Sequence, residues 1–180
     1  MALLVRVVVS CALVLGGLDV SAQAPSREYQ IKAVFLFNFA QFVEWPPRAF
    51  PSGETPLVIG VLGEDPFGSY LDETVRGERV NNRPLEVQRY RRVEEITTCH
   101  VLFVSRSEAG HLDQTLASLK DRNILTVGDA DDFVRRGGAI QLANAQNRVR
   151  LLINPDAAKA ANLTISSKLL RAAELVTPSR

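Results

Sequence analysis

The sequence contains few of the residues that most often carry enzyme chemistry, since its 180 residues include two cysteines and two histidines. Neither His100 nor His111 has a serine or cysteine nucleophile beside it in a recognisable motif. Cys99 precedes His100, but adjacent residues of a strand point to opposite faces of a sheet, so the two side chains are not expected to share a proton. The sequence therefore predicts no catalytic residue and a protein that binds a partner rather than an enzyme.

An excess of charge of one sign is also missing, because 21 lysines and arginines face 20 aspartates and glutamates. A balanced chain has no general attraction to nucleic acid. The basic cluster at residues 89–92 is followed at once by Glu94 and Glu95, which favours a solvated edge with local ion pairs. The composition, 46% hydrophobic and 23% charged, is typical of a globular protein. No nucleic-acid partner is predicted.

Phosphate and metal motifs are absent as well. Residues 60–68 are glycine-rich and follow a predicted strand, but their spacing matches no nucleotide fingerprint. Glu64 and Asp65 would place negative charge where a phosphate has to lie. The acidic residues 129–132 lack the spacing of a calcium loop and are interpreted as a helix cap, Asp129, with acids in the first turn. No cofactor and no metal ion are predicted.

Long hydrophobic runs are confined to the N-terminus. Arg6, the apolar residues 7–18 and the small residues 20–22 are typical of a secretory signal peptide cleaved after Ala22. The run is shorter than the roughly 20 residues of a membrane span. A lipoprotein cleavage box at Cys11 is the alternative, disfavoured because the apolar run continues beyond it. We expect a signal at 1–22 and a single mature domain at 23–180, with Cys99 as its only thiol and no intramolecular disulfide.

The mature chain alternates strand and helix patterns. Strands are predicted at 56–62, 85–90, 100–104, 124–127, 139–142 and 149–153, and helices at 28–44, 66–75, 112–119, 129–135 and 166–176. Asn154 followed by Pro155 marks a further helix start. This order predicts an α/β fold, with a single domain and a mostly parallel sheet that carries helices on both faces and a late antiparallel hairpin.

The first predicted helix, 28–44, lacks glycine and proline and has a broad apolar face. That face, which is expected to lie in the core, consists of Ile31, Phe35, Leu36, Phe39, Phe42 and Val43.

The opposite side of the same helix also carries apolar residues. Val34 and Phe37, with Trp45 at the helix end, project to the side of Gln41. Two interpretations stay open: another part of the chain covers these residues, or they form an exposed docking strip of the kind that marks protein interfaces. The candidate partner-binding residues are therefore Val34, Phe37, Gln41 and Trp45.

Three segments carry a family resemblance. They are AVFLFNFAQFVEWP at 33–46, ILTVGDADDFVRRGGAIQL at 124–142, and RVRLLINPDAAKAANLTISSKLLRAAELV at 148–176. Together they resemble the YfiR family of periplasmic regulators, and the last segment is the most specific. The similarity extends over essentially the whole mature chain and agrees with the α/β prediction.

The resemblance implies a periplasmic repressor that binds the periplasmic sensor domain of an inner-membrane diguanylate cyclase and lowers cyclic-di-GMP signalling and biofilm formation. It also implies an outer-membrane lipoprotein antagonist as a second partner, and it leaves a homodimer open. The family's redox-responsive disulfide pairs have no counterpart here, because Cys99 is the only mature thiol. The alternative function is a periplasmic small-ligand binding module serving a membrane sensor or transporter, with its pocket at the carboxyl ends of the parallel strands.

Overall fold

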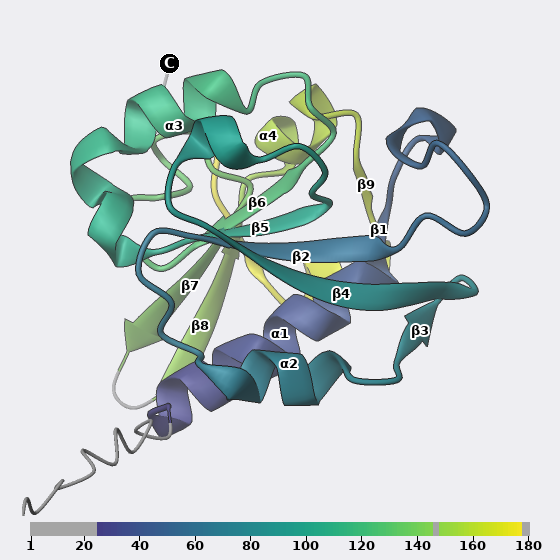
Figure 1. Cartoon of the computed structure of the whole chain (residues 1–180). Coiled ribbons are helices and arrows are strands. Elements are labelled where there is room, and N and C mark those ends of the chain that lie inside the picture. The colour runs from purple at the N-terminus through teal and green to yellow at the C-terminus, as the bar shows by residue number, and fades with distance from the viewer. Residues whose placement is uncertain (1–24, 146–147, 178–180) are drawn as a thin grey trace, which may run out of the picture.

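A computed structural model describes residues 25–145 and 148–177, so the predicted signal at 1–22 lies outside the described residues. One eight-stranded sheet lies between two layers of helices (Figure 1). Its strands, in spatial order, are β10 (Glu174–Leu175), β8 (Arg148–Ile153), β7 (Ile140–Ala145), β6 (Leu125–Gly128), β5 (Val101–Val104), β2 (Leu57–Leu62), β4 (Arg83–Tyr90) and β3 (Arg79–Val80).

The helices are α1 (Arg27–Phe42), α2 (Ser69–Val75), α3 (Leu112–Ser118), α4 (Pro155–Ala160) and α5 (Ser167–Arg171). Short 3-10 turns span Pro47–Ala49, Val93–Glu95 and Arg106–His111. Helices α1 and α2 lie on one face of the sheet, and α3 and α4 lie on the other (Figure 1).

Five neighbouring strands, β4, β2, β5, β6 and β7, run parallel, and β8 returns antiparallel to β7. Numbered along the chain, these five have the order 2-1-3-4-5, which is the flavodoxin-like order of doubly wound sheets. The chain leaves β2 toward β4 on one side and later enters β5 on the other, so the topological switch point lies between β2 and β5. The predicted fold, with its late hairpin, is confirmed.

Four predicted helices differ from the structure, and one of them, predicted at 66–75, begins at Ser69. Helix α1 ends at Phe42 because Val43 and Glu44 are extended and form β1 (Val43–Glu44), which pairs antiparallel with β9 (Thr164–Ile165). The short helix at 129–135 is wrong: these residues form turns, in which Asp132 has a positive φ of 56° that a helix does not tolerate. The last helix, predicted at 166–176, stops at Arg171, and the chain then forms β10 beside β8.

The core consists of two clusters, one on each face of the sheet. Alternation along β2 sends Leu57, Ile59 and Val61 toward the α1 face, where they join Leu36 and Phe39. The other cluster contains Leu62, Cys99, Leu102, Val104, Leu112 and Phe133. Both faces of the central strands are therefore buried, which explains why β2, β5 and β6 read as continuous apolar runs.

Candidate functional site

The outer side of α1 exposes apolar surface, but only some of the residues predicted to form the docking strip are exposed. Val34 is 42% exposed, Gln41 is exposed and Phe37 is half-buried against the core. The prediction that Ile31 lies in the core is wrong, because its side chain is 38% exposed. Phe35 and Phe42, also expected in the core, are only half-buried.

Trp45 lies apart from this helical surface because α1 ends three residues before it. Its indole Nε1–H donates to the His100 carbonyl at 3.2 Å, and its ring meets the His100 ring edge to face at 6.2 Å. The structure thus brings Val34, Phe37 and Gln41 together on one helix, while Trp45 packs partly inward. Partner binding by these four residues stays a prediction.

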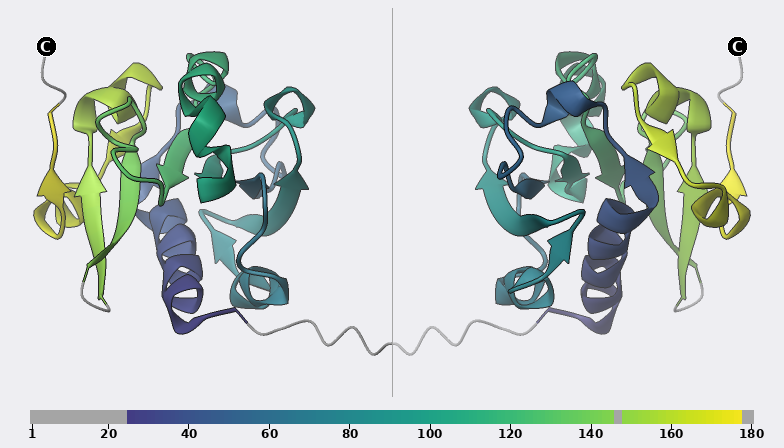
Figure 2. Two further views of the ribbon diagram at one scale, coloured as in Figure 1. Left: turned by 90° about the vertical axis from the view of Figure 1, so that its left-hand side faces the viewer. Right: turned by 90° about the vertical axis from the view of Figure 1, so that its right-hand side faces the viewer.

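A groove of about 360 Å³ adjoins the start of this exposed side, between α1 and the β7–β8 hairpin. Figure 2 shows the hairpin standing beside the helix. The groove is lined by Arg27, Glu28, Ile31, Asn144, Arg148 and Val149. Arg27 and Arg148 are exposed and make no ion pair with another described residue. We call Ile31, Val34 and the two arginines the α1 docking face.

The inner side of α1 holds a buried ionic network that no local sequence pattern predicts. Lys32 is 0% exposed, and its Nζ lies 2.8 Å from Asp129 Oδ2 and 2.5 Å from Glu28 Oε1. Asp129, at the carboxyl end of β6, is 1% exposed and is not the helix cap that was predicted. The Tyr29 hydroxyl donates to the same Oδ2 at 2.9 Å.

The groups around Asp129 satisfy its backbone carbonyl and one of its two carboxylate oxygens. Burial and the neighbouring Asp129 carboxylate raise the pKa of Tyr29 well above its usual value, so the phenol keeps its proton and remains a donor. The Arg106 guanidinium donates to the Asp129 backbone carbonyl at 2.9 Å. Asp129 Oδ1, in contrast, is buried and has no hydrogen-bond partner in the structure.

A crevice of about 370 Å³ lies at the topological switch point, where the loops after β2 and β5 meet the start of α1. It is lined by Tyr29, Glu64, Asp65, Pro66, Ser105, Arg106 and Ser107. Such crevices at the carboxyl ends of parallel strands are the usual ligand sites of open α/β sheets. Tyr29 and Arg106 belong to this lining and also contact Asp129, so the buried carboxylate lies directly behind the crevice wall.

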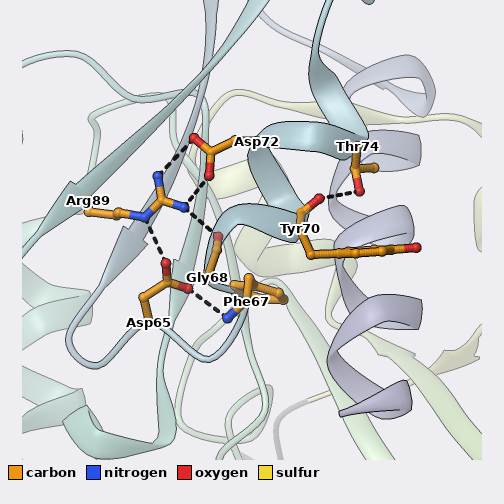
Figure 3. Close-up of polar contacts among 7 residues, drawn as sticks. All are labelled: Asp65, Phe67, Gly68, Tyr70, Asp72, Thr74 and Arg89. Atoms are coloured by element: carbon orange, nitrogen blue, oxygen red, sulfur yellow. Dashed lines mark hydrogen bonds and ion pairs between the residues drawn. The ribbon is translucent and has the colours of Figure 1, made fainter. Parts of the chain in front are cut away.

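Arg89 fixes one wall of the crevice (Figure 3). Its Nε donates to Asp65 at 2.7 Å, and its two terminal nitrogens reach Asp72 and the Gly68 carbonyl. The hydrogen bond from Arg89 holds the pKa of Asp72 below its usual value. The loop between β2 and α2 is thereby tied to the end of β4. In the same basic cluster, Arg92 pairs with Glu95 at 3.1 Å, which is the local ion pairing predicted for residues 89–92.

Cys99 and His100 lie just before β5, and their side chains point to different surroundings. The Cys99 thiol is buried in the cluster under α3, and burial raises its pKa to about 12. The His100 ring lies on the opposite side and stacks on Phe50 at 4.4 Å. Its Nδ1 accepts from the Val58 N–H at 3.0 Å, so Nε2 carries the proton and donates to the Ala49 carbonyl at 3.1 Å. Neither side chain is arranged as a nucleophile or base.

The strand order and the doubly covered parallel sheet place the chain in the class of doubly wound α/β domains. Within that class, the YfiR/HmsC-like family model matches residues 29–174, and the chain belongs to this family of periplasmic regulators linked to diguanylate cyclases. No curated protein matches the chain. None of the helices in the described part of the chain is long and apolar enough to cross a membrane.

Among solved structures, the chain is similar to an ABC domain in complex with L-Trp from Streptococcus pneumonia, at 13% identity and a TM-score of 0.49. The match covers 67% of this chain and 55% of that one, so the chain spans about half the length of the structure it matches.

Proposed function

We propose that this protein binds the periplasmic sensor domain of an inner-membrane diguanylate cyclase and represses it, which lowers cyclic-di-GMP levels and biofilm formation. Membership of the YfiR/HmsC-like family supports the regulatory role. The single observation that carries the binding surface is the exposure of Ile31 and Val34 on consecutive turns of α1. In this proposal, an outer-membrane lipoprotein removes the repressor from the cyclase.

The α1 docking face has the composition of a protein interface. Two branched apolar side chains lie one turn apart, and an exposed arginine borders them on the helix and another on the hairpin. Arginine and buried apolar groups are frequent at interface centres. Gln41 and half-buried Phe37 extend the surface along the helix. The partner surface expected from this chemistry is apolar with carboxylates at its edge.

The test is binding of the purified mature protein to the purified periplasmic domain of a cyclase encoded in the same genome. Val34→Glu should weaken binding by about 2 kcal/mol, roughly thirtyfold, because it places a charge in an apolar contact. The fold should remain nearly intact, since surface substitutions usually change stability by about 0.5 kcal/mol or less.

Two control variants separate docking from packing. Leu175→Glu makes the same chemical change at another exposed apolar residue, 55% exposed on β10, and should leave binding unchanged. Phe39→Glu introduces a charge at a fully buried position and should unfold the protein. Phe37→Glu should lie between these limits, because Phe37 is half-buried. If Val34→Glu binds the cyclase domain as tightly as wild type does, the interface lies elsewhere on the protein. If wild type does not bind the cyclase domain, the proposed function is wrong.

A small-ligand binding module is the second candidate function. The observation that favours it is the switch-point crevice with a buried, unpartnered carboxylate oxygen behind it.

A further inference from the structure

Asp129 Oδ1 is the side-chain oxygen or nitrogen in the described part of the chain that is buried without any hydrogen-bond partner. Leaving a buried acceptor unsatisfied costs free energy, and folded proteins rarely do so without a reason. The other oxygen of the same carboxylate already accepts from both Lys32 and Tyr29. The carboxylate therefore has capacity for one more donor, and no described side chain supplies it.

The surroundings of this oxygen favour a donor that is also a cation. Glu64 is exposed at the crevice and makes no ion pair with a described residue, whereas Asp65 beside it is paired with Arg89. Behind the wall, Lys32 is shared between Asp129 and Glu28, so these two carboxylates and one ammonium group carry a formal charge of −1. Arg106 is the one cationic residue in the lining.

Arg106 is held by fewer contacts than Tyr29, the other lining residue that contacts Asp129. The Arg106 side chain is exposed, makes no ion pair with a described residue, and is held by its hydrogen bond to the Asp129 carbonyl. Tyr29, in contrast, is fixed by its bond to Asp129 and by edge-to-face packing on Phe67 at 5.6 Å. Tyr29 and Arg106 are the lining residues that contact Asp129, so a ligand that reaches Oδ1 from the crevice has to displace one of them.

We propose that the switch-point crevice binds a small molecule with a primary or secondary ammonium group, which displaces Arg106 and donates an N–H to Asp129 Oδ1. Glu64 then contributes long-range attraction at the mouth. This site is distinct from the α1 docking face and does not depend on cyclase binding, so it is tested on the mature protein alone.

The experiment is a nitrogen-15 NMR titration of the mature protein with three probes: putrescine, tetramethylammonium and inorganic phosphate. Putrescine should give saturable shifts at the backbone amides of Tyr29, residues 105–107 and Ala130. Tetramethylammonium has the charge but no N–H donor, so it should give no saturable shifts at these amides. Phosphate, as the anion probe, should also give none.

Amino-acid substitutions test whether each residue strengthens or weakens putrescine binding. Glu64→Gln, at an exposed position, should weaken putrescine binding about threefold, and Asp129→Asn should weaken it about tenfold or more. Arg106→Ala should tighten binding about threefold, because it removes both the covering side chain and a repelling cation. Asp156→Asn, which removes an exposed carboxylate at the start of α4, is the matched control and should have no effect.

The outcomes that overturn the proposal are equally specific. Equal shifts with tetramethylammonium would mean general charge attraction, and absence of saturable putrescine shifts would mean that Oδ1 holds only water. Saturable phosphate binding lost in Arg106→Ala would make the crevice an anion site. If Asp129→Asn fails to fold, the opposite effects expected for Glu64→Gln and Arg106→Ala still decide the matter.

Discussion

Replacing Lys32 with methionine should destabilise the mature protein severely, although only the terminal ammonium group of the unbranched side chain is lost. Lys32 and Asp129 are 0% and 1% exposed, and their charged atoms are 2.8 Å apart. Removing one partner of a buried ion pair leaves an uncompensated charge and typically costs about 3–5 kcal/mol. Tyr29 would remain as a donor to Asp129, but a neutral hydroxyl does not replace an ammonium group. The free energy of unfolding of a whole domain is about 5–15 kcal/mol, so this single substitution would remove a large share of the stability.

The double variant Lys32→Met with Asp129→Leu tests the reasoning. Exchanging both charges for apolar groups is often neutral or stabilising, so the double variant should recover to within about 2 kcal/mol of wild type. Asp129→Leu alone should cost less than Lys32→Met, because Lys32 keeps Glu28, whose carboxylate is partly solvated. Urea unfolding followed by circular dichroism gives the four free energies of a double-mutant cycle. A cost of about 1 kcal/mol or less for Lys32→Met, or strict additivity of the two changes, would refute the buried pair as a structural determinant.

Three further predictions follow from buried groups. Burial lowers the pKa of His100 below its unfolded value of about 6.5, so the unfolded state takes up the proton first and stability should fall as pH drops from 7.5 to 5.5. Urea midpoints at the two pH values should show this loss in wild type and in His111→Gln, but not in His100→Gln; equal loss in all three would contradict it. Cys99, with its raised pKa, should resist iodoacetamide at pH 8 in the native protein and react once unfolded; rapid native labelling would show an accessible thiol. Gly60→Ala should cost about 1–3 kcal/mol in the same urea assay, because a Cβ would lie 2.8 Å from Cys99 Sγ and from the Tyr90 ring, and an unchanged midpoint would show that the neighbours yield freely.

The strands were predictable because their burial is encoded locally. Strands β2, β5 and β6 are covered on both faces and consist of short, mostly apolar runs that end at glycine or a polar residue, which is a signal that needs no knowledge of the partner strands. The start of α4 was also predictable, because its signal lies in neighbouring residues. Asn154 Oδ1 accepts from the Ala157 N–H at 3.1 Å, and Pro155 lies in the first turn.

The orientation of α1 was less predictable, because it depends on what the helix packs against. Its buried residues are Lys32, Ala33, Leu36, Phe39 and Ala40, a regular helical stripe that contains one lysine and two alanines. A search for large apolar residues finds Leu36 and Phe39 but rotates the stripe toward Ile31 and Phe35, so it misses the lysine and the two alanines. The alanines permit close approach to the sheet, and the lysine is buried because Asp129 meets it from 97 residues away in sequence. No local pattern contains that contact, and for the same reason the role of Asp129 was mistaken for a cap.

Helix α1 links the two surfaces for which functions are proposed. Tyr29 and Lys32 on its inner side reach Asp129 behind the crevice, while Ile31 and Val34 between and after them face solvent. A ligand that recruits Asp129 Oδ1 acts on the carboxylate that holds this turn of the helix in place. If the ligand changes affinity for the cyclase through that turn, linkage requires the cyclase to change affinity for the ligand by the same factor. A regulator built in this way would need no disulfide to respond to its surroundings, and Cys99, buried under the opposite face of the sheet, takes no part in the proposed connection.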